Sequence, residues 1–313
     1  MKSMGSFIAL LSGLAVTLAV WLLLSAMTAD ARQSAFVQEC DLLNNRMQTQ
    51  LDQQVLILRG LEKTLASYVD IVRDVFELAV SVPGNSQPGI VSIGYAPLVT
   101  QSELSSYVDY VRLSAHPGFY IHPEGLREFY LPIEYMVSRK ESDSLLGMDL
   151  LSILPVDKAM DTTHTIHVVD FVAGNAAGKP VENVLLTLNI GLQLPPTGSR
   201  GTCFVILDPS AVLASALMYS YDSSRVAFAV TGSEKDQRVL FSPSSLPENN
   251  LVHHDSLWLG DAVWLVEYHA RAEVFQAEKN DLPSILLVGG IIFSTIIFIL
   301  IRIIEGRLRK RSA

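Results

Sequence analysis

The chain has 313 residues, of which 49% are hydrophobic and only 18% charged, and its formal net charge is −9. This composition argues against a fully soluble enzyme, because soluble domains usually carry about 25% charged residues. The acidic balance argues against nucleic acid as a partner, because phosphate binding requires a basic surface. Two cysteines, Cys40 and Cys203, provide neither a disulfide scaffold nor a cysteine metal cluster.

Two long apolar stretches lie near the ends of the chain. Residues 7–27 contain no charged residue, and the second stretch is uncharged from Leu282 to Ile301. Both exceed the roughly 18 residues that a membrane-spanning helix needs, so we expect transmembrane helices at 7–27 and 282–303. The alternative for the first stretch is a cleaved signal peptide, but the apolar region of a signal peptide is only about 7–15 residues long.

The charges that flank these stretches predict the orientation. Five cations follow Ile301: Arg302 comes directly after it, and the other four lie in the basic tail at 304–313. Lys2 precedes the first stretch. Basic flanks stay in the cytoplasm, so both ends are expected inside and the main domain outside, in the periplasm of a bacterium with the protein in its inner (plasma) membrane. The tail is too short to fold, so a signalling output would reside in another protein.

Residues 30–82 are expected to form stalk helices. Apolar residues recur there at steps of three and four, which places them on one face of a helix. They are Phe36, Cys40, Leu43, Met47, Leu51, Val55, Leu58, Leu61 and Leu65. This face predicts either pairing with a second copy in a homodimer or packing against the chain's own domain. Paired stalks would allow a Cys40–Cys40 bridge, but the default expectation for Cys40 and Cys203 is two buried free thiols.

Two mixed segments follow the stalk. Residues 85–196 are expected to hold strands at 89–99, 119–122, 129–137, 166–172 and 184–192, with helices at 103–115 and from 147 to about 162. Residues 200–272 are expected to hold strands at 202–207, 225–230, 238–241 and 262–268, with a helix at 209–219. The expected fold class is α+β: a long N-terminal helix, then two stacked PAS-like subdomains, membrane-distal and membrane-proximal, between two transmembrane helices.

Four short motifs occur in order between the apolar stretches: 58–61 (Leu-Arg-Gly-Leu), 89–97 (Gly-Ile-Val-Ser-Ile-Gly-Tyr-Ala-Pro), 129–135 (Phe-Tyr-Leu-Pro-Ile-Glu-Tyr) and 146–150 (Leu-Gly-Met-Asp-Leu). Together they resemble the CHASE domain, an extracytoplasmic sensor of plant cytokinin receptors and of bacterial histidine kinases and nucleotide cyclases. The resemblance implies dimers and a small-molecule ligand bound in the membrane-distal subdomain. It also implies that Asp149 takes the place of the acidic residue that hydrogen-bonds adenine in the cytokinin receptors.

The chain departs from the family pattern in three places. Asn189-Ile190-Gly191 stands where a Pro-Val pair is usual, and Tyr95 stands where a tryptophan is usual. These positions are expected to line the ligand pocket, so the ligand of the relatives does not transfer to this chain. The family's usual cytoplasmic enzyme is also missing after the second apolar stretch.

Four residues are candidates for ligand binding: Asp149, Tyr95, Tyr130 and Tyr135. A carboxylate among apolar neighbours needs partners, which a ligand with N–H groups would supply, but Asp149 can instead cap the helix that follows it. The three tyrosines offer flat apolar walls for a pocket, but they can equally pack in the core of a sheet.

No metal, cofactor or enzymatic activity is expected. The pairs His164/His167 and His253/His254 lack a third ligand at a spacing that zinc would use, and no nucleophile, phosphate-loop or metalloprotease motif occurs. We therefore expect a CHASE-type sensor that signals to a separate histidine kinase or cyclase. The alternatives are an accessory envelope protein that uses the same fold as an interaction surface, and a receptor split from its output domain.

Overall fold

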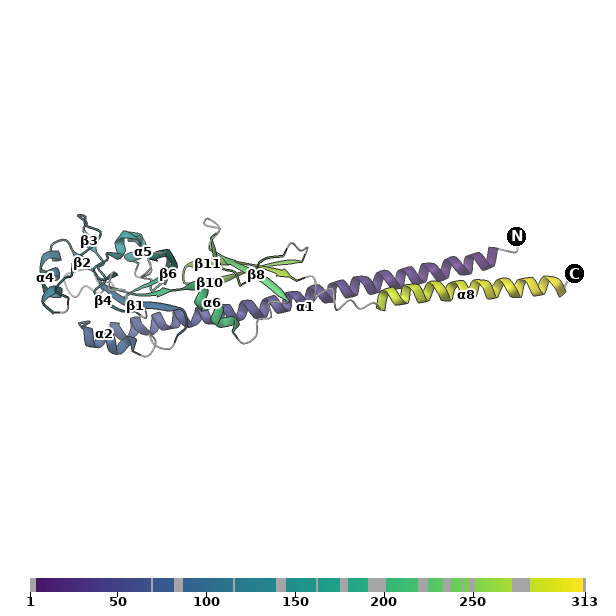
Figure 1. The fold of residues 1–313 in the computed structure, drawn as a ribbon, viewed down its shortest axis with the longest axis horizontal. Coiled ribbons are helices and arrows are strands. Elements are labelled where there is room, and N and C mark those ends of the chain that lie inside the picture. The colour runs from purple at the N-terminus through teal and green to yellow at the C-terminus, as the bar shows by residue number, and fades with distance from the viewer. Residues whose placement is uncertain are drawn as a thin grey trace.

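The protein is an elongated rod in which two paired helices form one end and two antiparallel sheets lie along the other part (Figure 1). The computed structural model describes residues 4–68, 70–81, 87–114, 116–138, 145–161, 163–174, 180–190, 201–218, 225–232, 238–243, 245–247, 251–271 and 282–311. Its mixture of a long N-terminal helix and antiparallel sheets confirms the expected fold class.

The first helix, α1, is continuous from Met4 to Ala66 and is 63 residues long. The expected anchor and stalk are therefore one element, which is consistent with the absence of proline from this stretch. Figure 1 shows α1 running from the N-terminus beneath both sheets to the far end of the molecule. Any shift of α1 relative to the sheets is thus shared with its membrane-facing part.

The membrane-distal sheet has five antiparallel strands in the order β4-β1-β7-β6-β5. Their bounds are β1 Ile90–Pro97, β4 Tyr135–Ser138, β5 His167–Gly174, β6 Pro180–Asn189 and β7 Gly201–Leu207. A separate two-stranded ribbon joins β2 (Val99–Thr100) to β3 (Phe129–Tyr130). Thus the expected strand at 129–137 is two short strands, which are separated by the segment that contains Pro132.

Strand β7 differs in position from the sequence expectation. Residues 200–272 were expected to start the proximal subdomain, but β7 pairs with both β1 and β6 and is the central strand of the distal sheet. All seven of its residues are buried, as expected of a strand covered on both faces. The proximal subdomain therefore begins after Leu207.

The membrane-proximal sheet has four antiparallel strands in the order β10-β11-β8-β9. Their bounds are β8 Val226–Thr231, β9 Val239–Phe241, β10 Val252–Leu259 and β11 Ala262–Ala270. Strand β10 was not expected from the sequence. Helix α6 (Pro209–Leu217) precedes this sheet, and the carboxylate of Asp208 caps it by accepting from the N–H of Ala211 at 3.1 Å.

The apolar stripe of α1 packs against the chain's own sheets. Eight of its nine expected members are buried, and Val55 is partly buried against the same core. The core also holds Ile93, Val184 and Leu207 of the distal sheet and Phe228 and Tyr268 of the proximal sheet. Of the two roles expected for this stripe, the structure thus shows intramolecular packing. Cys40 and Cys203 are both buried free thiols.

Shorter elements complete the distal subdomain. They are α2 (Arg73–Val80), α4 (Leu104–Ser114), the 3₁₀ helix η2 (Leu150–Ser152) and α5 (Val156–Ala159). Residues 119–122 were expected to form a strand, but only an isolated bridge between His122 and Met148 forms there. The backbone of this segment instead hydrogen-bonds to the motif at 146–150, as described below.

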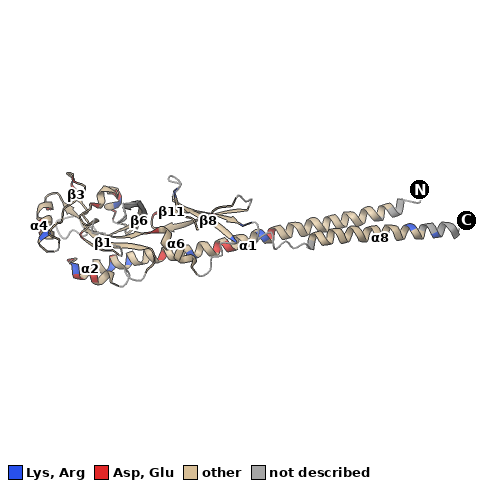
Figure 2. Cartoon of the chain, in the orientation of Figure 1, with Lys and Arg blue, Asp and Glu red and all other residues tan. Residues whose placement is uncertain are grey.

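Helix α8 (Leu282–Arg311) lies beside the N-terminal half of α1 (Figure 1). Both helices are long and apolar enough to cross a membrane, and Figure 2 shows them free of charge over most of their paired length. An added Cβ at Gly13 would lie 2.7 Å from Ser294 Oγ, and one at Gly290 would lie 2.4 Å from Thr17 Cγ2. These two glycines therefore permit the close approach of the helices.

Candidate functional site

The two motifs around 129–135 and 146–150 are partners in one backbone network. The Ile133 N–H donates to the Met148 carbonyl at 2.9 Å, and the Leu150 N–H donates to the Leu131 carbonyl at 2.9 Å. On the other side, the Asp149 N–H donates to the His122 carbonyl at 2.7 Å. The segment 147–149 is thus held between two neighbouring segments, which fixes the position of the Asp149 side chain.

Asp149 is completely buried and its carboxylate has partners on both oxygens. Oδ1 accepts from the N–H groups of Leu131 at 2.9 Å and Leu151 at 3.1 Å, and Oδ2 accepts from Nη1 of Arg127. The bond from Leu151 caps the helix η2, so the capping role expected of Asp149 is present. Both oxygens of this buried carboxylate are therefore satisfied by donors from the protein itself.

Arg127 and Tyr130 form the outer part of this polar group. The Arg127 side chain is 29% exposed, so part of it reaches solvent while Nη1 contacts Asp149. The Tyr130 hydroxyl accepts from the Arg127 N–H at 3.0 Å and lies 2.6 Å from Gln101 Oε1, to which it can donate. Tyr130 therefore holds the backbone at Arg127, and Asp149 holds its guanidinium. We refer to Gln101, Arg127, Tyr130 and Asp149 as the Arg127 cluster.

An apolar cluster lies beside the Arg127 cluster, on the face of the distal sheet that points away from α1. Its buried members come from the sheet, the motif segments and α5: Ala96, Leu98, Leu131, Ile133, Met148, Leu150, Leu154, Ala159, Leu185, Phe204 and Ile206. An added Cβ at Gly94 would lie 2.1 Å from the ring of Phe204. Glycine at this position thus allows the Phe204 ring to pack across β1.

Tyr95 and Tyr135 lie on the opposite face of the distal sheet. Their rings stack with centroids 6.4 Å apart, and Tyr135 also stacks on Phe76 of α2 at 5.8 Å. Both belong to the core that packs against α1. The structure therefore brings Asp149 together with Tyr130, and Tyr95 together with Tyr135, as two separate groups.

A buried carboxylate, Glu134, adjoins the second pair of tyrosines. The Tyr107 hydroxyl of α4 donates to Glu134 Oε2 at 3.0 Å. Burial raises the pKa of Glu134 above its ordinary value, while hydrogen bonds from Tyr135 and Tyr107 partly oppose this rise. Burial, with the neighbouring Glu134, also raises the pKa values of Tyr107 and Tyr135.

Arg127 and Glu134 were not singled out from the sequence. The signal for Glu134 was present, because it is a charged residue within the apolar run Leu131-Pro-Ile-Glu-Tyr135. Arg127 gave no such signal, because it lies in a loop among other charged residues, and only the fold places it against Asp149.

The junction between the two subdomains carries a second polar group. The His167 ring of β5 lies between two carboxylates, with Nε2 2.9 Å from Asp161 Oδ2 and Nδ1 3.0 Å from Asp261 Oδ2. Lys158 Nζ contacts the same Asp261 oxygen at 2.6 Å. Asp261 lies at the turn between β10 and β11, so these contacts connect the proximal sheet to the distal one.

Both carboxylates at this junction are easier to ionise than an ordinary aspartate. Hydrogen bonds from Thr163 lower the pKa of Asp161, with a smaller contribution from His167. Burial raises the pKa of Asp261, but the bonds from His167, Lys158 and the Val168 N–H outweigh it and the net pKa is lowered. Each group therefore adds stability above pH ~4, and this stability is lost as pH falls through the lowered pKa.

Acidification is expected to unfold the junction through these two groups. In the full chain in detergent micelles, the thermal midpoint should fall as pH is lowered from about 5 towards 3, because both carboxylates must then take up protons. Asp261→Asn should make this fall shallower, whereas Asp157→Asn, an exposed position on α5, should leave it unchanged. Equal pH slopes for the wild type and Asp261→Asn would contradict the prediction.

Sequence comparison finds a family match within the distal part of the chain. Residues 70–165 match the family model of the CHASE domain. The match spans the Arg127 cluster and the two paired motifs, and it confirms the resemblance that these motifs indicated. No curated protein shows significant sequence similarity to the chain. The family match and the two apolar helices support a sensor domain held at a membrane.

Partial structural similarity extends to solved periplasmic and ligand-binding domains of bacterial proteins. The periplasmic sensory domain of the Campylobacter jejuni chemoreceptor Tlp1 is 11% identical, with 80% of this chain and 96% of that chain covered and a TM-score of 0.49. The ligand-binding domain of the Pseudomonas aeruginosa PAO1 amino acid chemoreceptor PctC, in complex with GABA, is 13% identical, with 75% and 98% covered and a TM-score of 0.44. The periplasmic domain of Vibrio cholerae LuxQ is 14% identical, with 76% and 100% covered and a TM-score of 0.31.

Proposed function

We propose that this protein is a membrane-anchored extracytoplasmic sensor that binds a small molecule in its distal subdomain and signals through α1 to a separate output protein. The observation that carries the proposal is the continuity of α1, which packs against both sheets and reaches the membrane helix pair without a break. The CHASE match over the distal subdomain supports the sensory role. The family match also favours sensing over catalysis.

The proposed ligand site is the solvent-exposed side of the Arg127 cluster. Asp149 is fully engaged by protein donors, so it positions Arg127, and the exposed part of the guanidinium provides donors for the ligand. A guanidinium recognises carboxylate and carbonyl oxygens best, so the ligand carries such a group. Tyr95 and Tyr135 act on the other face, where they transmit changes in the sheet to α2 and α1.

The proposed orientation follows the flanking charges. Figure 2 shows basic residues at the far end of α8, and Arg302 lies over the rings of Phe7 and Phe298 at 5.8 and 5.7 Å. These cations keep the end of the helix pair in the cytoplasm and the sheets in the periplasm of a bacterial inner membrane. Ligand binding then shifts the equilibrium between two states of α1, either in a single chain or in a homodimer. The difference in the ligand's affinity for the two states sets the size of this shift.

A thermal-shift screen of the full chain tests the ligand site. The purified protein in detergent micelles is screened against small carboxylic acids, amino acids and purines. A compound that binds the site should raise the thermal midpoint of the wild type and of Arg73→Gln, an exposed arginine in α2, but not of Arg127→Gln. A screen without any stabilising compound, or a shift retained in Arg127→Gln, would overturn the proposal and favour an accessory protein without a ligand.

A further inference from the structure

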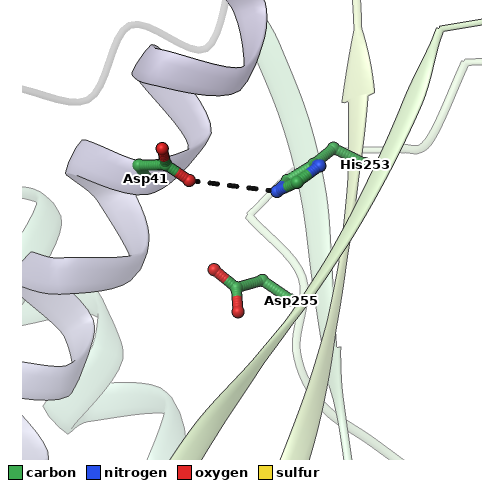
Figure 3. A group of neighbouring side chains, drawn as sticks. All are labelled: Asp41, His253 and Asp255. Carbon is green, nitrogen blue, oxygen red and sulfur yellow. Dashed lines mark ion pairs between the residues drawn. The ribbon is translucent and has the colours of Figure 1, made fainter.

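Three potential metal ligands meet where α1 passes the proximal sheet. Asp41 comes from α1, and His253 and Asp255 come from β10 (Figure 3). One ligand atom from each lies within 4.8 Å of the other two, and His253 Nε2 is 3.9 Å from Asp41 Oδ1. In Figure 3 all three side chains point into the space between the helix and the strand.

The fold holds these residues in place from both sides. His253 and Asp255 are two positions apart on a strand, so they project from the same face, and their backbones pair with Tyr268 and Val266 of β11. On α1, the Asn44 side chain donates through Nδ2 to the Ser256 carbonyl at 3.2 Å, and its Oδ1 accepts from the Tyr268 hydroxyl at 3.1 Å. The helix and the strand are thus linked one turn away from the three side chains.

The local charge favours a cation. Two carboxylates converge on one imidazole at this point.

We propose that Asp41, His253 and Asp255 bind a divalent transition metal ion, with Zn²⁺ as the best match. An imidazole nitrogen favours Zn²⁺ over Mg²⁺ or Ca²⁺, which prefer oxygen ligands alone. Zinc bonds of about 2.1 Å place tetrahedral ligand atoms about 3.4 Å apart, so the side chains need to close by only about 0.5–1.5 Å. The Asp41 side chain is more than half exposed, which leaves a coordination position open to water or to an incoming ligand.

A metal at this position would act on signalling directly. It would join α1 to β10, the edge strand of the proximal sheet, less than two helical turns from Phe36, where the buried stripe of α1 begins on the membrane side. Bound Zn²⁺ would therefore oppose any sliding or rotation of α1 against the sheet. This role is independent of the Arg127 cluster, which lies in the other subdomain.

Zinc titration of the full chain tests this proposal. The protein is purified without a histidine tag, stripped with a chelator and titrated with Zn²⁺ in detergent micelles, by calorimetry and by thermal unfolding. One Zn²⁺ per chain should bind, and the thermal midpoint should rise on the order of 5 °C when Zn²⁺ is near a hundred times its dissociation constant. His253→Gln should abolish both effects, and Asp41→Asn and Asp255→Asn should each weaken binding at least ~tenfold.

His254→Gln is the matched control, because this neighbouring histidine projects from the opposite face of β10 and is exposed. It should bind Zn²⁺ like the wild type. Equal losses in His254→Gln and His253→Gln would show adventitious binding to surface histidines and overturn the site. Binding that survives Asp41→Asn unchanged would also overturn it, because this exposed substitution does not threaten the fold.

Discussion

Replacing Asp149 with alanine is expected to lower the free energy of unfolding of the distal subdomain by about 3 kcal/mol. The change removes one partner of a buried ion pair, which typically costs about 3–5 kcal/mol, and leaves the N–H groups of Leu131 and Leu151 without their acceptor. The lower end of the range applies because Arg127 is 29% exposed and can regain water. Asp149→Asn retains the acceptor oxygen and should lose about half as much.

The measurement should separate the two subdomains. The three tryptophans, at 21, 258 and 264, lie outside the distal subdomain, so their fluorescence follows the rest of the chain. Proteolysis of the distal subdomain at increasing urea concentrations reports the predicted loss, with Asp109→Ala on the exposed side of α4 as the control. An Asp149→Ala variant as resistant as this control would show that the buried carboxylate contributes little to the fold.

Replacing Gly147 with alanine is expected to be comparably damaging, at about 2 kcal/mol or more. Gly147 has a φ of +81°, a conformation that costs other residues roughly 1–2 kcal/mol. An added Cβ would also lie 2.0 Å from the Tyr120 carbonyl oxygen, which belongs to a backbone that cannot move easily. The substitution should therefore displace the segment that carries Asp149 and weaken ligand binding at the Arg127 cluster as well.

Gly118→Ala provides the matched control for this substitution. An added Cβ at Gly118 has no atom within 4 Å, so the change should alter stability by less than about 0.5 kcal/mol. The same proteolysis assay compares the two variants. If both glycine variants unfolded at the same urea concentration, the tight contact at Gly147 would not affect the free energy of unfolding, and the prediction would be wrong.

Some parts of the distal site could be predicted from short motifs. The segments 129–135 and 146–150 were recognised as a pair, and the structure shows the reason, since they exchange backbone hydrogen bonds around Asp149. Which side each tyrosine faces could not be predicted. The face to which each side chain points depends on a bulge between Ile90 and Ser92 and on the interruption between β3 and β4. Such irregularities leave no clear periodic signal in the sequence.

Strand β10 shows a different limit of prediction from the sequence. Its first half reads Val-His-His-Asp-Ser, which lacks the apolar alternation typical of a half-buried strand. It becomes a strand because it pairs along its whole length with β11, and its polar residues face α1 or solvent at the edge of the sheet. Tertiary pairing here overrides a weak local preference.

Local sequence patterns were enough to predict the two apolar helices, the long amphipathic stalk, the mixed α+β class and the resemblance to CHASE domains, because each depends on residues close together in the chain. The three-dimensional arrangement was needed to show that the stalk stripe packs on its own sheets, that β7 belongs to the distal sheet, and that Arg127 contacts Asp149. It also brought Asp41 beside His253 and Asp255. These outcomes depend on the register and order of strands from distant segments, which the spacing of residues along the chain does not encode.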